Sequence, residues 1–277
     1  MPQFAVNHMT VARLGYTELL DLAASLGCVG VEVRDDLGKP LFDGLDPVTA
    51  GAMARDRGLR ILALAEVKRF NDWSEGKSRE ARELMGIAVA CGAEAVSLIP
   101  RNDNGGMGNG ERQGALRVAL KALRPMLEDH DLIGLVEPLG FLACPLRIKA
   151  DTVEVIEALG AGDRFRIVHD TFHHHLAHHH LSGGGPIFAG HTGIVHVSGV
   201  VDPRLSVDEM GDRHRVLVDG ADRLDNLGQL RALEAAGYRG PVSFEAFAPE
   251  TQAEPDPAAA LRRSMEFIRS RLAAQAA

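Results

Sequence analysis

Residues 165–199, FRIVHDTFHHHLAHHHLSGGGPIFAGHTGIVHVSG, contain the pattern that decides the fold. A short apolar run, FRIVHD, ends on Asp170, and a second apolar run further on, GIVHVSG, carries His196. Short runs rich in β-branched residues and bounded by Gly and Pro are typical of buried strands. The stretch therefore predicts two neighbouring strands with a helical turn and a loop between them.

The same alternation extends along the whole chain in both directions. Longer amphipathic segments such as TELLDLAASLG and SREARELMGIAVACG separate the apolar runs, and several end in Gly just before the next run, as a left-handed helix C-cap requires. Strands alternating with helices in this way match a (β/α)8 barrel, an α/β fold of ~250 residues. The predicted strands are FAVNH (4–8), VGVEVR (29–34), LRILALAE (59–66), AEAVSLIP (93–100), LIGLVEP (132–138), FRIVHD (165–170), GIVHVSG (193–199) and PVSFEAF (241–247).

An open, doubly wound sheet is the main alternative architecture. It has less support, because no G-x-G-x-x-G motif follows the first predicted strand. The chain also has no Pro/Ser-rich linker or low-complexity segment that would mark a domain boundary. We therefore predict a single TIM-barrel domain over residues 1–277.

Composition and charge exclude several classes of function. The formal charge of −8 argues against a nucleic-acid surface, which normally carries a basic patch or stripe. No segment approaches the ~20 apolar residues that span a bilayer, and the N-terminus, MPQFAVNHMT, lacks the features of a signal peptide. The three cysteines are widely spaced and form no C-x-x-C motif, which is typical of a reducing compartment. We expect a cytoplasmic protein without nucleic-acid or membrane partners.

Acidic and imidazole side chains lie at or near the ends of the last four predicted strands. They are Glu137 in GLVEP, Asp170 in RIVHD, His196 in IVHVSG and Glu245 in VSFEAF. The carboxyl ends of barrel strands converge around one axis and supply the catalytic residues. Charged groups inside a barrel are costly unless they are paired or bind a metal. Three oxygen ligands and one imidazole suit one divalent ion (Mn²⁺, Mg²⁺, Co²⁺ or Zn²⁺), so we expect a metal centre.

Such a centre leaves coordination positions open for a substrate. A vicinal carbonyl and hydroxyl can chelate there, and the ion would stabilise an enediolate. Two of the expected ligands, Glu137 and Glu245, can also carry protons on opposite faces of that intermediate. The pattern therefore predicts catalytic proton transfer by these two glutamates.

Other polar residues are candidates for substrate contacts. His173, on the segment just after Asp170, is placed to donate a hydrogen bond to a substrate oxygen or to ligate a second metal. Four more candidates end the third predicted strand or lie on the long connection after His196, and each can touch substrate or form a salt bridge instead. They are Glu66, Lys68, Arg204 and Arg213.

Two further segments have less specific expectations. The remaining histidines of HHHLAHHH (173–180) are predicted to form a solvated helical turn that binds metal only adventitiously. The run NDNGGMGNGERQG (102–114) is predicted to be a flexible loop, and it is too irregular for a phosphate-binding P-loop.

Five short motifs, taken in order, resemble the xylose-isomerase-like superfamily of sugar isomerases and epimerases, which also includes endonuclease IV. They are Glu137-Pro138, Asp170-Thr171-Phe172-His173, His196-Val197-Ser198, Asp212-Arg213-His214 and Ser243-Phe244-Glu245. The resemblance covers nearly the whole chain and is nearest to keto-inositol isomerases and hydroxypyruvate-isomerase-like proteins. It implies a metal held by the four residues above, proton transfer by the two glutamates, a substrate contact from His173, and a homo-oligomer as one form of assembly.

The chain departs from relatives at two places. Ketose 3-epimerases carry a second glutamate six residues after the first, whereas position 143 here is Ala143, and many members have Pro-Gly-x-Gly where this chain has Val218-Asp219-Gly220-Ala221. We predict a metal-dependent isomerase or epimerase of a ketose or keto-inositol (inosose), acting through a cis-enediolate. The alternatives are a lyase like inosose dehydratase, an endonuclease IV-like nuclease, and a barrel that binds a sugar without turnover.

Overall fold

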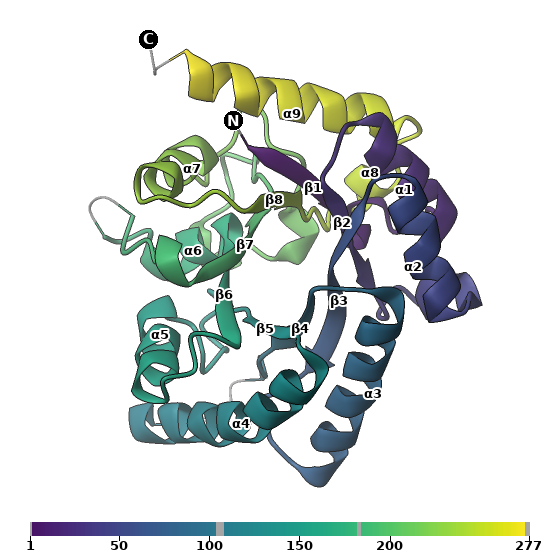
Figure 1. The fold of residues 1–277 in the computed structure, drawn as a ribbon. Helices are drawn as coiled ribbons and strands as arrows, with labels where there is room; N and C mark the ends of the chain where they lie inside the picture. Colours follow the sequence, from purple (N-terminus) through teal and green to yellow (C-terminus); the bar gives the residue numbers. More distant parts are fainter. Residues whose placement is uncertain (1, 104–107, 182–183, 275–277) are drawn as a thin grey trace.

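In the computed structural model, which describes residues 2–103, 108–181 and 184–274, parallel strands close into a barrel (Figure 1). Each strand pairs with its neighbours in chain order, and β1 pairs with β8 to close the sheet. The strands are β1 (Gln3–Asn7), β2 (Gly30–Arg34), β3 (Arg60–Lys68), β4 (Ala95–Ile99), β5 (Ile133–Val136), β6 (Phe165–Asp170), β7 (Thr192–Val197) and β8 (Pro241–Phe244).

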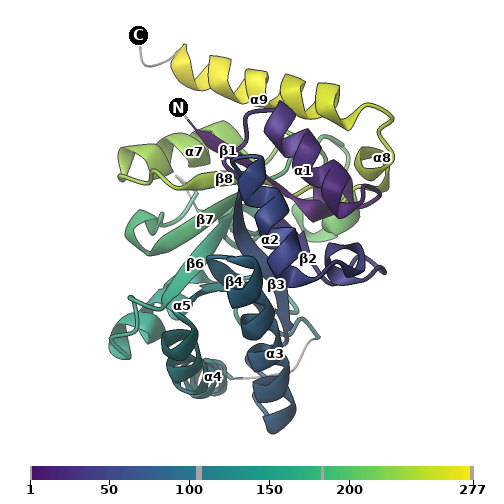
Figure 2. The same cartoon turned by 45° about the vertical axis from the view of Figure 1, so that its right-hand side comes forward.

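Helices alternate with the strands and form a ring around them (Figures 1 and 2). In Figure 1, α3 and α4 lie on one side of the barrel and the C-terminal α9 lies across the other. The helices are α1 (Tyr16–Ser25), α2 (Pro47–Asp56), α3 (Glu75–Cys91), α4 (Asn109–His130), α5 (Lys149–Ala158), α6 (Thr171–His178), α7 (Asn226–Ala235), α8 (Pro249–Gln252) and α9 (Pro257–Ala273). The predicted (β/α)8 barrel is confirmed.

Local sequence signals account for where individual helices begin and end. The Ser74 side chain accepts a hydrogen bond from the Lys77 N–H at the start of α3, and Gly92 ends that helix in the left-handed conformation, with φ 74°. At the start of α4, the Glu111 carboxylate accepts a hydrogen bond of 2.9 Å from the Gly108 N–H. The loop prediction for 102–114 was therefore wrong for residues 109–114, which are helical, while residues 104–107 lie outside the described part of the chain.

The barrel interior is divided into an apolar layer and a polar layer. Because successive side chains of a strand point to opposite faces, residues two apart share the inward face. Leu135 thus precedes Glu137, Val168 precedes Asp170, and Ile194 precedes His196. The apolar layer, a separate buried cluster, includes Ala5, Ala63, Ala95, Leu135, Val168 and Ile194. The polar layer lies above it, at the carboxyl ends of the strands.

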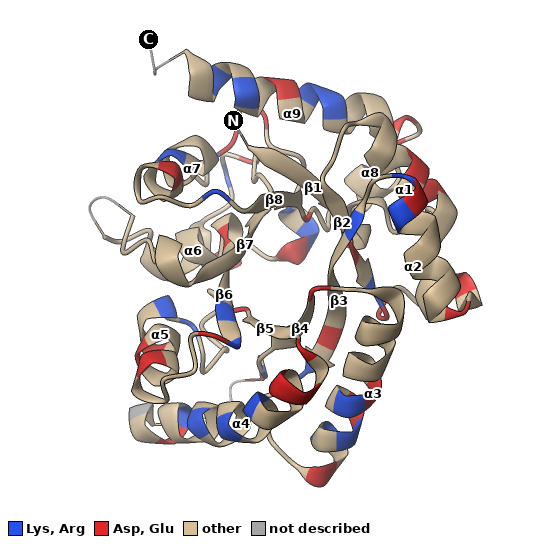
Figure 3. Cartoon of the chain, in the orientation of Figure 1, with Lys and Arg blue, Asp and Glu red and all other residues tan. Residues whose placement is uncertain are grey.

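The outer surface carries both signs of charge. Figure 3 shows Lys and Arg interspersed with Asp and Glu along outer helices such as α3 and α9. No helix in the described part of the chain is long and apolar enough to cross a membrane.

Candidate metal centre

The last four strands carry the four predicted ligands to one place. Asp170 is the last residue of β6 and lies in register with His196 of β7. Glu137 directly follows β5, and its N–H donates to the Leu98 carbonyl at 3.2 Å. Glu245 directly follows β8, and its N–H donates to the Val197 carbonyl at 3.0 Å. The barrel hydrogen bonding thus continues through both glutamates and fixes where their side chains start.

The four side chains converge. Glu137, Asp170, His196 and Glu245 are all buried, and each offers one ligand atom within 4.8 Å of the others. His196 Nδ1 lies 3.1 Å from Glu245 Oε2, 3.8 Å from Glu137 Oε1 and 4.0 Å from Asp170 Oδ2. One divalent ion placed among these atoms could be reached by all four.

The hydrogen bonding of His196 fits a metal ligand. Its Nε2 lies 3.0 Å from Glu32 Oε2, while its buried Nδ1 makes no hydrogen bond to any residue that the structure describes. Histidines that bind metals usually donate their other ring N–H to a carboxylate, which fixes the ring orientation. Glu32 supplies that carboxylate and leaves the Nδ1 lone pair for an ion.

The cluster concentrates negative charge in a buried place. Burial and the neighbouring Glu245 carboxylate raise the pKa of Glu137 to about 7. Burial opposes ionisation of Glu245 as well, but His196 and the nearby guanidinium groups hold the pKa of that carboxyl well below its usual range. Burial likewise lowers the pKa of His196, yet the Glu245 and Glu32 carboxylates outweigh it and hold the pKa well above 6.5. A divalent cation would relieve this repulsion.

Two buried arginines, which the sequence did not single out as site residues, contact the cluster. Arg215 donates from Nη2 to Asp170 Oδ2 at 2.5 Å and to Glu245 Oε2 at 3.0 Å. Arg34, the last residue of β2, donates from Nη1 to Glu245 Oε1 at 3.0 Å. The sequence contains a signal for Arg34. Glu32 and Arg34 lie two residues apart in an otherwise apolar strand, so their side chains share one face of it.

A cavity of about 160 Å³ opens onto the cluster. Its walls combine polar groups with apolar side chains, which suits a small molecule that carries both hydroxyl groups and a carbon skeleton. They are formed by Arg34, Glu66, Ile99, Asn102, Glu137, Leu139, Phe141, His173, Asp212, Arg215, Glu245 and Phe247.

The structure brings two of the predicted substrate contacts to this cavity. His173 lines it, with Nε2 3.9 Å from Glu137 Oε1, and its buried Nδ1 has no hydrogen-bond partner among the described residues. Glu66 also lines it, and its carboxylate lies 3.5 Å from Arg34 Nη2 and 3.2 Å from Lys68 Nζ. Both side chains are placed to contact a bound molecule.

The other three predicted substrate contacts do not line the cavity. The Lys68 side chain is 57 % exposed and reaches Glu66 from outside the lining residues. The Arg204 side chain is 88 % exposed and pairs with Asp202. The exposed Arg213 donates to His214 Nε2 at 2.9 Å. In this structure Lys68 and Arg204 form salt bridges, and Arg213 contacts a neighbouring histidine.

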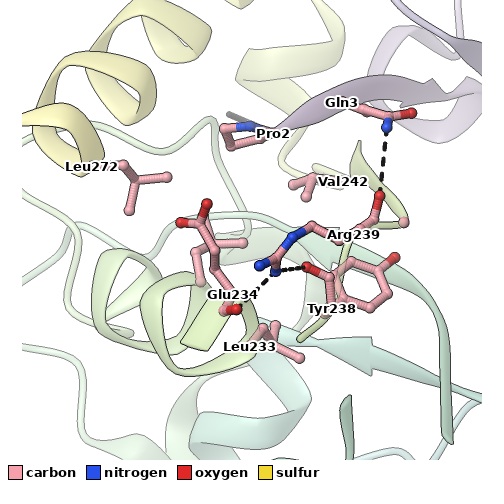
Figure 4. A pocket seen from close by; sticks show the side chains of 10 residues that line it. Pro2, Gln3, Leu233, Glu234, Tyr238, Arg239, Val242 and Leu272 are labelled. Carbon is pink, nitrogen blue, oxygen red and sulfur yellow. Dashed lines mark hydrogen bonds between the residues drawn. The ribbon is translucent and has the colours of Figure 1, made fainter. Parts of the chain in front are cut away.

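A second cavity, of about 120 Å³, lies at the opposite end of the strands (Figure 4). Its lining includes Gln3 at the start of β1 and Val242 near the start of β8. The Arg239 guanidinium there donates to the backbone carbonyls of Glu234 and Tyr238. Because barrel enzymes use the carboxyl ends of their strands, the cavity beside the carboxylate–imidazole cluster is the candidate functional site.

The expectation of a solvated turn was wrong for His174 and His178, whereas His179 and His180 are exposed. His174 and His178 are buried, at 4 % and 3 % exposure. The His174 ring packs 4.8 Å from the ring of His169 and 4.6 Å from that of His178. These imidazoles pack α6 against the barrel. The sequence did not predict this, because a run of histidines has no hydrophobic periodicity that shows which face is buried.

The buried Lys149 contacts His169, which packs against His174, and its lowered pKa leads us to predict that stability depends on pH. Its Nζ lies 2.7 Å from His169 Nδ1, and burial lowers its pKa from 10.5 to about 7. Between these values the unfolded chain binds more protons than the folded chain, so stability rises with pH by at most about 1.4 kcal/mol per unit.

Replacing Lys149 by Met should remove that contribution to the slope. We expect the free energy of unfolding, measured with urea at several pH values between about 7 and 10.5, to rise less steeply with pH in Lys149→Met than in the parent. The exposed Lys121→Met serves as the control and should keep the parent slope. Equal slopes for Lys149→Met and the parent would contradict a neutral buried amine.

A closed (β/α)8 barrel with a buried carboxylate–imidazole cluster at the carboxyl ends of its strands defines the class of this protein. The chain belongs to the xylose isomerase-like TIM-barrel family, whose model matches residues 20–271. Members of this superfamily include sugar isomerases and epimerases. No curated protein matches the chain.

Solved structures of the same superfamily superpose along the whole chain. A xylose isomerase domain containing protein from Salmonella typhimurium LT2 has a TM-score of 0.86 and 28% identity, covering 98% of this chain and 97% of that one. The IOLI protein, solved with a bound zinc atom, has a TM-score of 0.85 and 18% identity, covering 98% and 99%. A D-allulose 3-epimerase from Methylomonas sp. has a TM-score of 0.70 and 16% identity, covering 98% of each chain. The last two likenesses show a common fold.

Proposed function

We propose that this protein is a divalent-metal-dependent isomerase or epimerase of a ketose or keto-inositol. The observation that carries the proposal is the convergence of Glu137, Asp170, His196 and Glu245, with one ligand atom each within 4.8 Å, beside a cavity of about 160 Å³. Family membership supports the same class of reaction. The zinc atom of the IOLI protein supports Zn²⁺ alongside Mn²⁺, Mg²⁺ and Co²⁺ as the ion.

The residues around the cavity supply what an enediolate reaction needs. A divalent ion held there would polarise a substrate carbonyl and an adjacent hydroxyl as a Lewis acid. Glu137 and Glu245 both border the cavity and can take up and return a proton at carbon. His173 lines the cavity, with its Nε2 3.9 Å from Glu137 Oε1, and can donate a hydrogen bond to a substrate oxygen.

The polar walls support a polyhydroxylated substrate. Asn102, Asp212 and Glu66 offer amide and carboxylate groups to hydroxyls, and the rings of Phe141 and Phe247 cover apolar faces. We propose a reducing cytoplasmic setting for the enzyme, supported by three free, buried cysteines.

Solvent deuterium exchange tests the proposal. The protein is stripped of metal, divided, and reconstituted with Mn²⁺, Mg²⁺, Co²⁺ or Zn²⁺. D-Fructose, D-psicose, D-tagatose and an inosose are then incubated in D₂O and followed by proton NMR. We expect metal-dependent loss of the proton signal at the carbon next to the carbonyl of one of these compounds, with formation of an isomer.

Two controls separate the proposed reaction from its alternatives. Addition of EDTA should stop the exchange, and the product spectrum distinguishes isomerisation from loss of water. Exchange that persists without metal would refute the metal-dependent mechanism. A dehydrated product would replace the proposal by the lyase reaction.

A further inference from the structure

A buried glutamine on α7 contacts both residues that flank Asp170 in the sequence. Gln229 is 8 % exposed, and its Oε1 lies 2.9 Å from Nε2 of His169, the residue before Asp170. Its Nε2 donates at 3.1 Å to the carbonyl of Thr171, the residue after Asp170. One side chain therefore holds the chain on both sides of an expected metal ligand.

The hydrogen bonds of this amide have a single possible direction. Besides Thr171, Gln229 Nε2 donates to the Leu224 carbonyl at 2.8 Å. Because both carbonyls can only accept, the nitrogen of the amide must face them, and Oε1 must accept from His169. A neutral imidazole has one donor and one acceptor, which leaves His169 Nδ1 to accept from Lys149 Nζ at 2.7 Å. The result is a continuous series of hydrogen bonds from α5 through β6 to α7.

The orientation of the Asp170 carboxylate depends on the first turn of α6. Its Oδ1 accepts from the His173 N–H at 3.0 Å, as the N-cap of that helix, and its Oδ2 accepts from Arg215. Thr171, which Gln229 holds, is the first residue of α6. A shift of this turn would move the N–H that orients the carboxylate and also the ring of His173, which lines the cavity.

Gln229 also holds the connection between β7 and α7, the segment that carries Arg215. Leu224, its second carbonyl partner, lies at the end of this connection. At the start of the connection, the Ser198 carbonyl accepts a hydrogen bond of 2.8 Å from Asn226 Nδ2, at the first residue of α7. The first turn of α7 thus joins both ends of the segment that brings the guanidinium to the metal centre.

Resting on the function proposed above, we propose that Gln229 is a positioning residue of the metal centre. It fixes Asp170 and the first turn of α6 before an ion binds, so that the ion meets a carboxylate already in place. A preorganised site binds more tightly because less ordering accompanies binding. Gln229 does not line the cavity, so it acts only through the residues that it holds.

Metal affinity tests this role. Gln229→Met keeps the approximate length of the side chain but cannot form the three hydrogen bonds. We expect the Kd for Mn²⁺, measured by equilibrium dialysis of the metal-stripped protein, to rise about 10–100-fold. At saturating Co²⁺, the visible absorption spectrum should also differ from the parent spectrum, because the Asp170 ligand has turned.

Two results of this experiment would overturn the proposal. A parent-like Kd would show that Gln229 does not preset the site. A raised Kd with a parent-like Co²⁺ spectrum would show that the geometry around the ion does not depend on Gln229, which would then have a purely structural role.

Tyr16→Phe is the matched control for the loss of a buried hydrogen bond. The buried Tyr16 hydroxyl donates to the Ala50 carbonyl at 2.8 Å. This contact joins α1 and α2, which lie on the other side of the barrel from α6 and α7 (Figure 1). The control should lower Tm, as Gln229→Met does, but keep the parent Kd and the parent Co²⁺ spectrum. Equal losses of metal affinity in the two variants would reflect stability alone and would contradict positioning.

A measurement without metal separates this proposal from the proposed function. Hydrogen exchange at the His173 N–H, followed by NMR in the metal-free protein, should be faster in Gln229→Met than in the parent, because its acceptor on Asp170 is no longer fixed. Tyr16→Phe should exchange there at the parent rate. If the parent binds no Mn²⁺, the proposed function fails, and equal His173 exchange rates in parent and Gln229→Met would reject positioning as well.

A shorter amide serves as the second variant. Gln229→Asn keeps a buried amide that is one methylene too short to reach all three partners. It should raise the Kd for Mn²⁺ and the His173 exchange rate in the same direction, and it decides the question if Gln229→Met does not fold. Parent values of both quantities in Gln229→Asn would overturn the proposal.

Discussion

Glu245→Gln is expected to lower kcat/KM by ~10³-fold or more while the barrel still folds. The amide keeps the shape of the side chain but removes the negative charge that a divalent ion requires, and general acid–base groups and ligands of this kind contribute ~10²–10⁴ in rate. In this variant Arg34 keeps its ion pair with Asp36. Arg215 keeps its ion pairs with Asp170 and Asp212, so each guanidinium still has a carboxylate partner. The measurement is metal-reconstituted kinetics on the exchanging sugar, with circular dichroism as the check on folding.

Glu66→Gln is the matched control for this variant. Glu66 also lines the cavity, and its side chain is 6 % exposed, but it is not one of the four clustered residues. We expect a change of less than about tenfold, as for loss of one substrate hydrogen bond. A near-parent rate in Glu245→Gln would exclude Glu245 from the reaction.

His196→Ala is expected to weaken metal binding more than ~100-fold, beyond the 10–100-fold typical of residues that only support a ligand. The truncation removes the single imidazole of the cluster and leaves Glu32 without its partner. Equilibrium dialysis against Mn²⁺ or Zn²⁺, with metal analysis of the protein, measures the effect. Because an ion that binds only the folded state stabilises it, added metal should also raise Tm in the parent more than in the variant.

The comparison with His173→Gln makes this test specific. His173 is equally buried and lies beside Glu137, but it is outside the set of converging ligand atoms. It should therefore retain the parent's metal content while losing activity. Parent-like metal binding by His196→Ala would remove His196 from the ligand set.

The barrel and the cluster could be predicted because both depend on local pattern. Short apolar runs, Gly-terminated helices and their alternation specify a (β/α)8 order, and closure of the barrel then brings all strand ends to one rim. Asp170 ends one apolar run and Glu245 lies near the end of another, so their convergence follows from the order of strands and helices alone. The side-chain period of two in a strand then places them above the apolar layer.

The contacts that distinguish one carboxylate from another could not be predicted in the same way. Whether Arg34 reaches Glu245 or solvent depends on a side-chain direction and on the position of Asp36, neither of which has a sequence period. Arg215 lies on an irregular connection, next to the exposed Arg213, and nothing in the local pattern separates the two. For the same reason the histidines of α6 gave no sign of which of them are buried.

The central claim is that Glu137, Asp170, His196 and Glu245 form one divalent metal site, and anomalous diffraction tests it most directly. Crystals of the parent protein grown with Zn²⁺ should give one strong anomalous peak at about 2.0–2.2 Å from His196 Nδ1 and from an oxygen of each of the three carboxylates. An anomalous map with no peak among these four residues, or with its main peak at the histidines of α6, would contradict the claim.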